Sequence, residues 1–208
     1  MLKGRPDISE NQEEQVLMLF GQVQECVKCT RMTGCKRVLS SANGDVSAKI
    51  MFVAEAPGRF GAERYGIPLF GDRTGKNFDS LLQKAGFMRA NVFITNAVLC
   101  NPRAQDGLND RPTFEEINSC NAWLRQTIQT ILPEVVVALG QVALNALSLI
   151  EEHELVLRKD VGRPTRWFGR YLIPFYHMSP RALMHRNMEK QAMDYKRLRK
   201  FATSIGGV

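Results

Sequence analysis

Short apolar runs recur at four places along the chain and determine the fold that we expect. They lie at residues 50–54, 92–95, 135–139 and 171–176. Runs of this length, rich in β-branched and aromatic residues and followed by turn-forming positions, are typical of buried strands. The chain is therefore expected to contain four central strands.

Segments with helical character alternate with these strands. They lie at residues 11–25, 75–86, 113–132, 141–150 and 187–202. The third segment opens with Thr113 and Glu116, the spacing of a capping box in which a hydroxyl and a carboxylate satisfy free amides. The alternation predicts an α/β fold, a three-layer sandwich whose central four-stranded parallel sheet is flanked by helices. A chain of 208 residues suits one domain across residues 1–208.

Polar side chains stand where three of the expected strands end. Glu55 follows the first strand directly before the turn formed by Pro57 and Gly58, Asn96 ends the second, and His177 follows the last. Each alone is better explained by a structural role: Glu55 as a cap, Asn96 as a turn residue and His177 as a core histidine. Carboxyl ends of parallel strands meet at one edge, where ligands bind in open α/β sheets. Together, the three side chains predict a site at that edge.

The charge balance adds a class of partner. Twenty-eight Lys and Arg against 21 Asp and Glu give a net charge of +7, which suits a polyanion such as DNA. Part of the excess lies at residues 158–170, which we expect to form a surface loop or ribbon. No apolar run approaches the ~20 residues of a membrane span, and the polar first 14 residues lack a secretory signal. We therefore expect a monomeric, cytoplasmic protein with no membrane partner.

Five cysteines offer a metal site. Cys26 and Cys29 form a CxxC pair, whereas Cys100 and Cys120 lie far along the chain and Cys35 stands between. In a reducing compartment such spacings indicate metal binding more than disulfides. The spacing fits either zinc or a [4Fe–4S] cluster, and a local triplet of Cys26, Cys29 and Cys35 is an alternative ligand set.

Four motifs occur in an order that resembles the uracil-DNA glycosylase superfamily. They are Ala-Glu-Ala-Pro-Gly at 54–58, Gly-Ile-Pro-Leu-Phe-Gly at 66–71, Thr-Asn at 95–96 and His-Met-Ser-Pro at 177–180. With the cysteines, they are most similar to the iron–sulfur branch, family four. The resemblance implies a monofunctional enzyme of DNA repair that flips uracil, or a related deaminated base, out of DNA and hydrolyses its N-glycosidic bond. It also implies a [4Fe–4S] cluster, in preference to zinc, whose ligands are Cys26, Cys29, Cys100 and Cys120.

The resemblance also assigns roles in base release. Asn96 would pair with the edge of the base, and His177 would stabilise negative charge on the leaving pyrimidine. Glu55 would orient water and offset positive charge on the sugar. Glu63 is a rival for that role, because the loop after Gly58 lacks the acidic cluster that the family carries there.

The remaining expected contacts surround the base and the DNA. The family places a Phe directly after the proline of the second motif, but this chain has Leu69 there and Phe70 next. Either residue could therefore pack on the base, beside the backbone of Ala56 and Gly58. The DNA contacts that the resemblance implies come from Ser179, Arg181 and Leu183, with Leu183 or Arg181 as the wedge that fills the gap left by the flipped base.

Two other functions compete with base release. A non-catalytic iron–sulfur protein could recognise damaged or single-stranded DNA without turning it over. A nucleotide hydrolase could bind phosphate with residues 57–75, but the chain lacks the Walker and dinucleotide patterns and we disfavour this reading.

Overall fold

A five-stranded sheet forms the centre of the computed structural model, which describes residues 10–206. The strand order is β2-β1-β3-β5-β4, and the pairs β1–β2, β1–β3 and β3–β5 are parallel. The strands are β1 (Ile50–Ala54), β2 (Phe93–Asn96), β3 (Val135–Leu139), β4 (Thr165–Trp167) and β5 (Arg170–Phe175). The α/β class and the four parallel strands agree with the sequence-based expectation, whereas the prediction of a wholly parallel, four-stranded sheet was wrong.

The additional strand has a local cause. β4 pairs antiparallel with β5 across a tight turn at Phe168 and Gly169, both of which have positive φ (47° and 72°). Such a two-residue turn matches the twist of a hairpin. Residues 165–167 are Thr, Arg and Trp, and only the last is apolar, so the sequence shows no apolar run there. The expected ribbon within residues 158–170 is thus the hairpin formed by β4 and β5.

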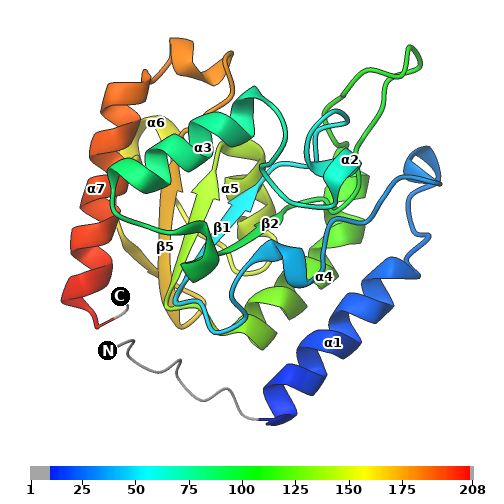
Figure 1. Ribbon diagram of the computed structural model, residues 1–208, viewed down its shortest axis with the longest axis horizontal. Coiled ribbons are helices and arrows are strands. Elements are labelled where there is room, and N and C mark those ends of the chain that lie inside the picture. The colour runs from blue at the N-terminus through cyan, green and yellow to red at the C-terminus, as the bar shows by residue number, and fades with distance from the viewer. Residues whose placement is uncertain (1–9, 207–208) are drawn as a thin grey trace.

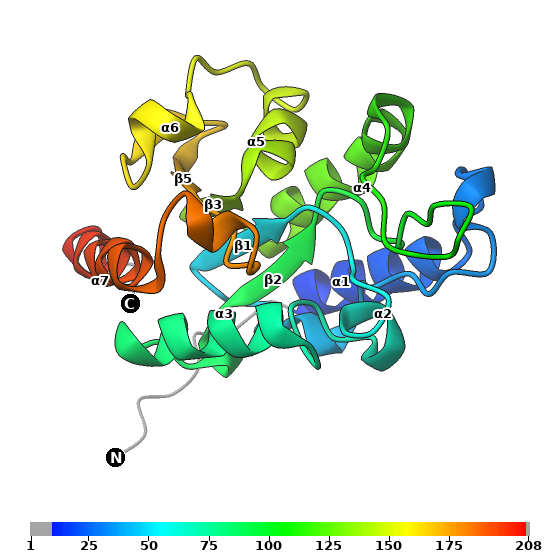
Figure 2. The same cartoon turned by 90° about the horizontal axis from the view of Figure 1, so that it is seen from above.

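Helices cover both faces of the sheet (Figures 1 and 2). They are α1 (Glu10–Gln24), α2 (Ala62–Tyr65), α3 (Arg73–Lys84), α4 (Phe114–Ile131), α5 (Gln141–Ser148), α6 (Leu157–Asp160) and α7 (Met188–Ser204), with short 3-10 turns η1 (Thr30–Met32), η2 (Ser41–Asn43), η3 (Arg89–Asn91) and η4 (Ala182–Met184). The capping box expected at Thr113 and Glu116 is present at the start of α4. No helix of residues 10–206 is long and apolar enough to cross a bilayer.

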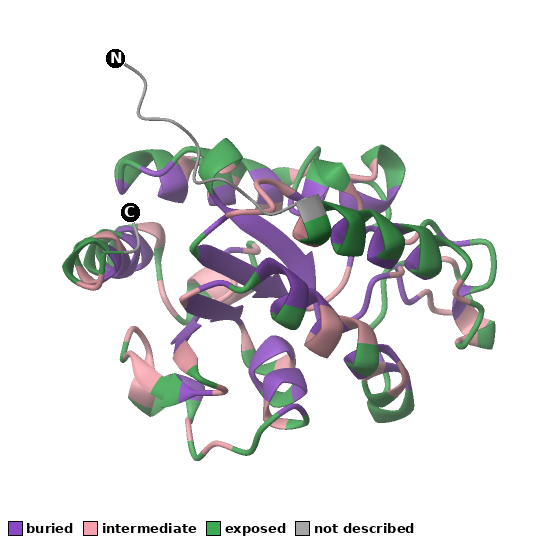
Figure 3. Cartoon of the chain, turned by 90° about the horizontal axis from the view of Figure 1, so that it is seen from below, coloured by how far each residue is buried: buried purple, intermediate pink, exposed green. Residues whose placement is uncertain are grey.

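Alternation along the strands builds two apolar layers. On β1, Met51 and Val53 pack into the cluster formed with α1, α4 and α5, whereas Ile50 and Phe52 pack into the cluster formed with α3 and α7. Every residue of β1, β2 and β3 is buried, as Figure 3 shows. This is the pattern of a parallel sheet covered on both sides, and it leaves the carboxyl edge as the place where polar groups can gather.

Candidate active site and cysteine centre

A cavity of about 300 Å³ opens at the carboxyl ends of the parallel strands. It is lined by the segments that follow β1, β2 and β5 and by the start of α3. Figure 2 looks onto this edge, with the segment after β5 (orange) close to the ends of β1 and β3. From β1 the chain continues to its neighbour β2 on one side of the sheet, and from β3 it continues to its neighbour β5 on the other side. The cavity therefore lies at the topological switch point of the sheet, where the direction of the connections reverses. Its volume is in the range of small-molecule sites.

His177 lines this cavity and carries a neutral ring. Burial lowers the pKa of His177 from 6.5 to about 4, against the opposing effect of the Asp72 carboxylate. Its Nδ1 atom accepts a hydrogen bond of 3.2 Å from the Ser179 amide, so the neutral ring carries its proton on Nε2. Gln191 on α7 donates to the His177 carbonyl at 3.2 Å and fixes the backbone. The ring therefore offers one N–H donor.

Glu55 lines the same cavity directly after β1. Burial raises the pKa of Glu55 above its usual value of 4.5, and the charge of Arg111 opposes that shift. Its carboxylate has no hydrogen bond or ion pair with any residue between 10 and 206. A carboxylate without a protein hydrogen bond can accept one from water, and its negative charge can stabilise a cationic sugar.

Asn96 lies beside Glu55 but deeper. As the last residue of β2 it pairs with Ala54, the residue before Glu55, and is 1% exposed. It does not line the cavity itself. Its Nδ2 atom is buried and lacks a hydrogen-bond partner within residues 10–206. A buried amide that stays unpaired costs about 1–3 kcal/mol, which suits a group reserved for a ligand.

Glu63 is not brought into the cavity. It lies in α2, is 6% exposed, and its Oε1 atom accepts from Arg103 Nη2 at 2.6 Å. It is absent from the residues that line the cavity. The partner Arg103 comes from the loop between β2 and α4, so this ion pair fastens that loop to α2.

Leu69 and Phe70 point in different directions. Leu69 lines the cavity and has a positive φ of 49°, which is uncommon for a residue with a branched side chain. The Arg89 guanidinium bonds the carbonyls of Pro68 and Leu69 and holds this turn. Phe70 is 38% exposed and packs edge-on against Tyr65, with ring centroids 5.5 Å apart. The apolar wall of the cavity is therefore Leu69.

The three expected DNA contacts lie in the segment after β5, where they occupy different positions. Ser179 and Arg181 line the cavity. Leu183 is half-buried in η4 and does not line it, whereas its neighbour Met184 is 80% exposed. Ala56 and Gly58 also line the cavity.

Several cavity residues were missed by the sequence analysis. Asp72 accepts from the Gly75 amide as the N-cap of α3, and a Cβ atom on Gly61 would lie only 2.7 Å from its Oδ2. The D-x-x-G pattern at the start of that helix could have identified it. Asn101 and Arg111 also line the cavity. They come from the loop between β2 and α4, whose course no local pattern predicts.

Four cysteines converge in a second cavity, between α1, η1 and α4. Cys26, Cys29, Cys100 and Cys120 all line it. Trp123 donates to the Cys26 sulfur and the Leu99 amide to the Cys120 sulfur, both at 3.4 Å. Burial raises the pKa of Cys100 and of Cys120 to about 12, so metal binding there would displace protons.

Cys35 stands outside this group. It is 2% exposed, does not line the cysteine cavity, and its thiol donates to the Asn101 carbonyl at 3.4 Å. Because Asn101 directly follows Cys100 in the chain, Cys35 lies near the four other cysteines, although it does not line their cavity. The geometry therefore favours the later cysteines over the local triplet.

The spacing of the thiols bears on which metal fits. Within residues 10–206, no three His, Cys, Asp or Glu side chains are grouped closely enough for one metal ion. A tetrahedral zinc with Zn–S bonds of 2.3 Å would bring its sulfurs to about 3.8 Å from one another. The described part of the chain therefore shows four thiols around one cavity but no metal site.

Comparison with known proteins gives one consistent family. Residues 42–202 match the model of the uracil DNA glycosylase superfamily. The type-4 uracil-DNA glycosylase of Thermotoga maritima is 32% identical over 80% of this chain and 83% of its own length, and that of Archaeoglobus fulgidus is 30% identical over 85% and 88%. A type-5 uracil-DNA glycosylase of Pyrobaculum aerophilum is 33% identical over 66% of this chain and 64% of its own.

Proposed function

This chain belongs to the uracil DNA glycosylase superfamily, and we propose from that premise that it removes uracil, or a related deaminated base, from DNA. The observation that carries the proposal is the cavity at the strand ends, where Glu55 and the neutral ring of His177 face one space. The reaction is hydrolysis of the N-glycosidic bond of a base flipped out of the stack, which leaves an abasic site. The proposal extends to a monomeric protein that meets DNA in the cytoplasm.

The leaving base needs a donor that does not lose its own proton. Bond cleavage places negative charge on the pyrimidine and positive charge on the sugar. The Nε2–H group of His177 donates to the O2 atom of the departing base, and its neutral state at physiological pH follows from its lowered pKa of about 4. Removal of one such donor typically costs 10²–10³-fold in rate.

Glu55 and Asn96 complete the reaction. The Glu55 carboxylate orients the attacking water and offsets the charge on the sugar, since it has no protein partner within residues 10–206. The Asn96 carboxamide accepts from N3–H and donates to O4 of uracil, a pattern that cytosine presents in reverse. The unpaired Nδ2 atom of Asn96 supports this role. Leu69 packs on the base in place of an aromatic ring.

The cysteine cavity supports the second part of the proposal. Cys26, Cys29, Cys100 and Cys120 would hold a [4Fe–4S] cluster, as the family-four resemblance implies, and all four line one cavity. When bound, such a cluster contributes cross-linking of α1, α4 and the intervening loops, with no redox step in base release. Ser179 and Arg181 would contact the DNA backbone, and Leu183 would serve as the wedge.

Release of uracil from a single-uracil oligonucleotide tests this function. The wild type should yield an abasic site, and His177→Ala and Asn96→Asp should each lose activity, by about 10²–10³-fold for His177→Ala. A thymine oligonucleotide is the control substrate. Saturable DNA binding without release of any deaminated base would instead support the non-catalytic alternative, and unchanged rates in both variants would contradict the site.

A further inference from the structure

Two arginines line the base cavity and come from different segments of the chain. Arg111 comes from the loop between β2 and α4, and Arg181 from the segment between β5 and α7. Both are exposed, and neither guanidinium has a hydrogen bond or ion pair within residues 10–206. They reach the cavity from segments that follow β2 and β5, which β1 and β3 separate in the sheet. The cavity therefore carries two positive charges, and that of Arg111 also acts on the Glu55 carboxylate.

Arg31, in the cysteine-rich segment, bonds to the part of the loop that carries Arg111. Arg31, in η1, binds both oxygens of Glu116 at 2.8 and 2.7 Å and Asp110 Oδ2 at 2.7 Å. It also donates to the Arg111 carbonyl at 3.0 Å. These bonds pair Arg31 with the carboxylates of Asp110 and Glu116. The charge of Arg111 acts instead on the Glu55 carboxylate across the cavity.

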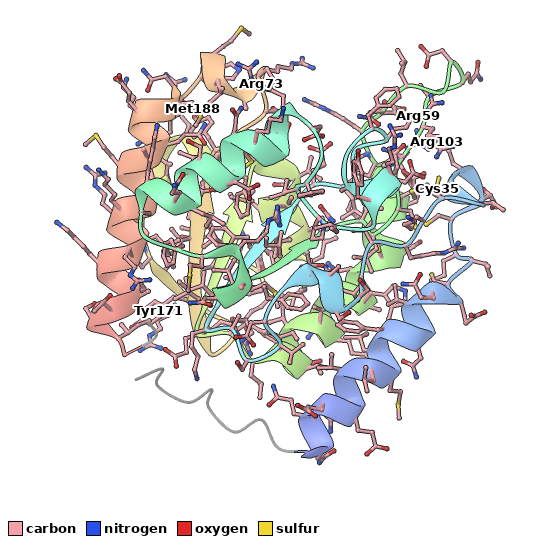
Figure 4. The ribbon with its side chains drawn as sticks, viewed as in Figure 1. Cys35, Arg59, Arg73, Arg103, Tyr171 and Met188 are labelled. Atoms are coloured by element: carbon pink, nitrogen blue, oxygen red, sulfur yellow. The ribbon has the colours of Figure 1, made fainter. Side chains whose placement is uncertain are left out.

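Other bonds fix the rest of this loop against the turn after β1. Asn101 donates to the Pro57 carbonyl at 2.6 Å, and the Arg59 amide donates to Asn109 at 2.9 Å. Arg103 pairs with Glu63, and Arg59 Nη1 reaches the Gly107 carbonyl at 2.6 Å. Figure 4 shows Arg59 and Arg103 beside α2 at the base of the projecting loop, close to Cys35. Arg59 and Arg103 are therefore held by bonds to this loop and to α2, whereas the Arg111 guanidinium makes no hydrogen bond or ion pair within residues 10–206.

We propose that Arg111 and Arg181 each bind one of the phosphates that flank the flipped nucleotide, and that Arg31 is the positioning residue for Arg111. This inference rests on the proposed function, because it needs a nucleotide in the cavity. Guanidinium groups bind phosphate oxygens through paired N–H donors. Such contacts hold the register of the protein on DNA and carry no sequence information. Arg111 and Arg181 should therefore affect all substrates alike.

Salt dependence of DNA binding tests the two contacts. The probe is a duplex with a stable abasic analogue, and affinity is measured by fluorescence anisotropy across a range of salt concentrations. Each of Arg111→Ala and Arg181→Ala should reduce the slope of log K against log salt by about 0.9. Between 50 and 200 mM salt, the advantage of the wild type should shrink about 3.5-fold.

A one-charge control separates these contacts from net charge. Lys84 ends α3, whose N-cap Asp72 lines the cavity, so twelve helical residues at 1.5 Å place Lys84 about 18 Å away. Lys84→Ala removes the same charge as the arginine variants and should leave the slope unchanged. Equal slopes for all three variants and the wild type, or an equal fall in all three variants, would overturn the proposal.

A chemical double-mutant cycle assigns each arginine to a phosphate. Methylphosphonate replaces one phosphate at a time on either side of the abasic analogue, which removes its charge. Arg111→Ala should cause no further loss at one of the two positions, and Arg181→Ala none at the other. Losses that add at both positions for both variants would exclude direct contact.

Arg31→Ala tests the positioning role. It should lower the salt slope as Arg111→Ala does, and the double variant should show no further fall. Iron content and thermal unfolding of the same samples establish that the fold is intact; a folded Arg31→Ala protein with the wild-type slope refutes positioning. Uracil release by the wild type is measured in parallel, so absence of base release counts against the proposed function, whereas unaltered slopes in an active protein count against the arginine contacts.

Discussion

The neutral ring of His177 gives the sharpest prediction about pH. Its pKa falls from 6.5 to about 4 because the ring is buried, a difference that corresponds to about 3 kcal/mol against charging it. At about pH 5.5 the ring is then ~97% neutral, whereas an ordinary histidine would be ~9% neutral. A rate that needs the neutral donor should therefore be about tenfold higher at this pH than an ordinary histidine allows.

Glu55, in contrast, should determine the acid limb of the rate. Its pKa is raised above 4.5 by burial, so it protonates at a higher pH than His177 does. Single-turnover uracil release should fall as the pH drops through the Glu55 pKa. His177→Asn should lower the rate at every pH and keep this limb, and Glu55→Gln should lower the rate and remove it.

Nuclear magnetic resonance measures the His177 ring directly. The chain has three histidines, so the His177→Asn spectrum identifies the ring signal by its loss. The same preference for the neutral ring contributes stability that is present above pH 6.5 and lost as the pH falls through about 4. A His177 signal that titrates near 6.5, or an acid limb that disappears in His177→Asn, would refute the reasoning.

Two further predictions concern the remaining acid and the cysteines. Glu63→Gln should leave the rate of base release within a few-fold of the wild type and lower thermal stability, because Glu63 is buried against Arg103 outside the cavity. Glu55→Gln is the matched comparison, with an expected loss of rate of about 10²–10⁴-fold. Equal losses of rate in the two variants would contradict this division of roles. After anaerobic purification, Cys120→Ser should lose visible absorbance and bound iron. Cys35→Ser should keep both, because Cys35 faces the Asn101 carbonyl outside the cysteine cavity. Iron loss in Cys35→Ser alone would favour the local triplet of Cys26, Cys29 and Cys35 as the ligand set.

Periodicity predicted the parallel part of the sheet closely. The expected strands at 50–54 and 135–139 have the bounds of β1 and β3, and the others differ by a residue or so at each end. Burial on both faces makes such strands continuous apolar runs, which is why they are visible in sequence. β4 lies at the edge of the sheet and consists of Thr165, Arg166 and Trp167, which is too short and too polar to give an apolar run.

The sequence pattern does not predict which side chains point into the cavity. Leu69 faces the cavity and Phe70 does not, because a positive φ at Leu69 turns the chain there and bonds from Arg89 hold that turn. Arg89 lies about 20 residues further along the chain. Glu63 likewise depends on Arg103, 40 residues away, for its position. Motif spacing locates the segments of a site, but such long-range bonds decide which residues enter it.

The cysteine centre gains a physical connection to base release through Arg31. Arg31 lies two residues after Cys29, and its bonds to Asp110, Glu116 and the Arg111 carbonyl span 79, 85 and 80 residues of sequence. An ordered loop of this length is entropically costly unless its ends and its middle are fastened. Cys100 lies near the start of this loop and Cys120 inside α4, which follows it, and Arg31 binds the part between Asp110 and Glu116. A cluster that fixed the four cysteines would therefore also fix the wall of the base cavity, which gives a hydrolytic site a reason to depend on a group that takes no part in the chemistry.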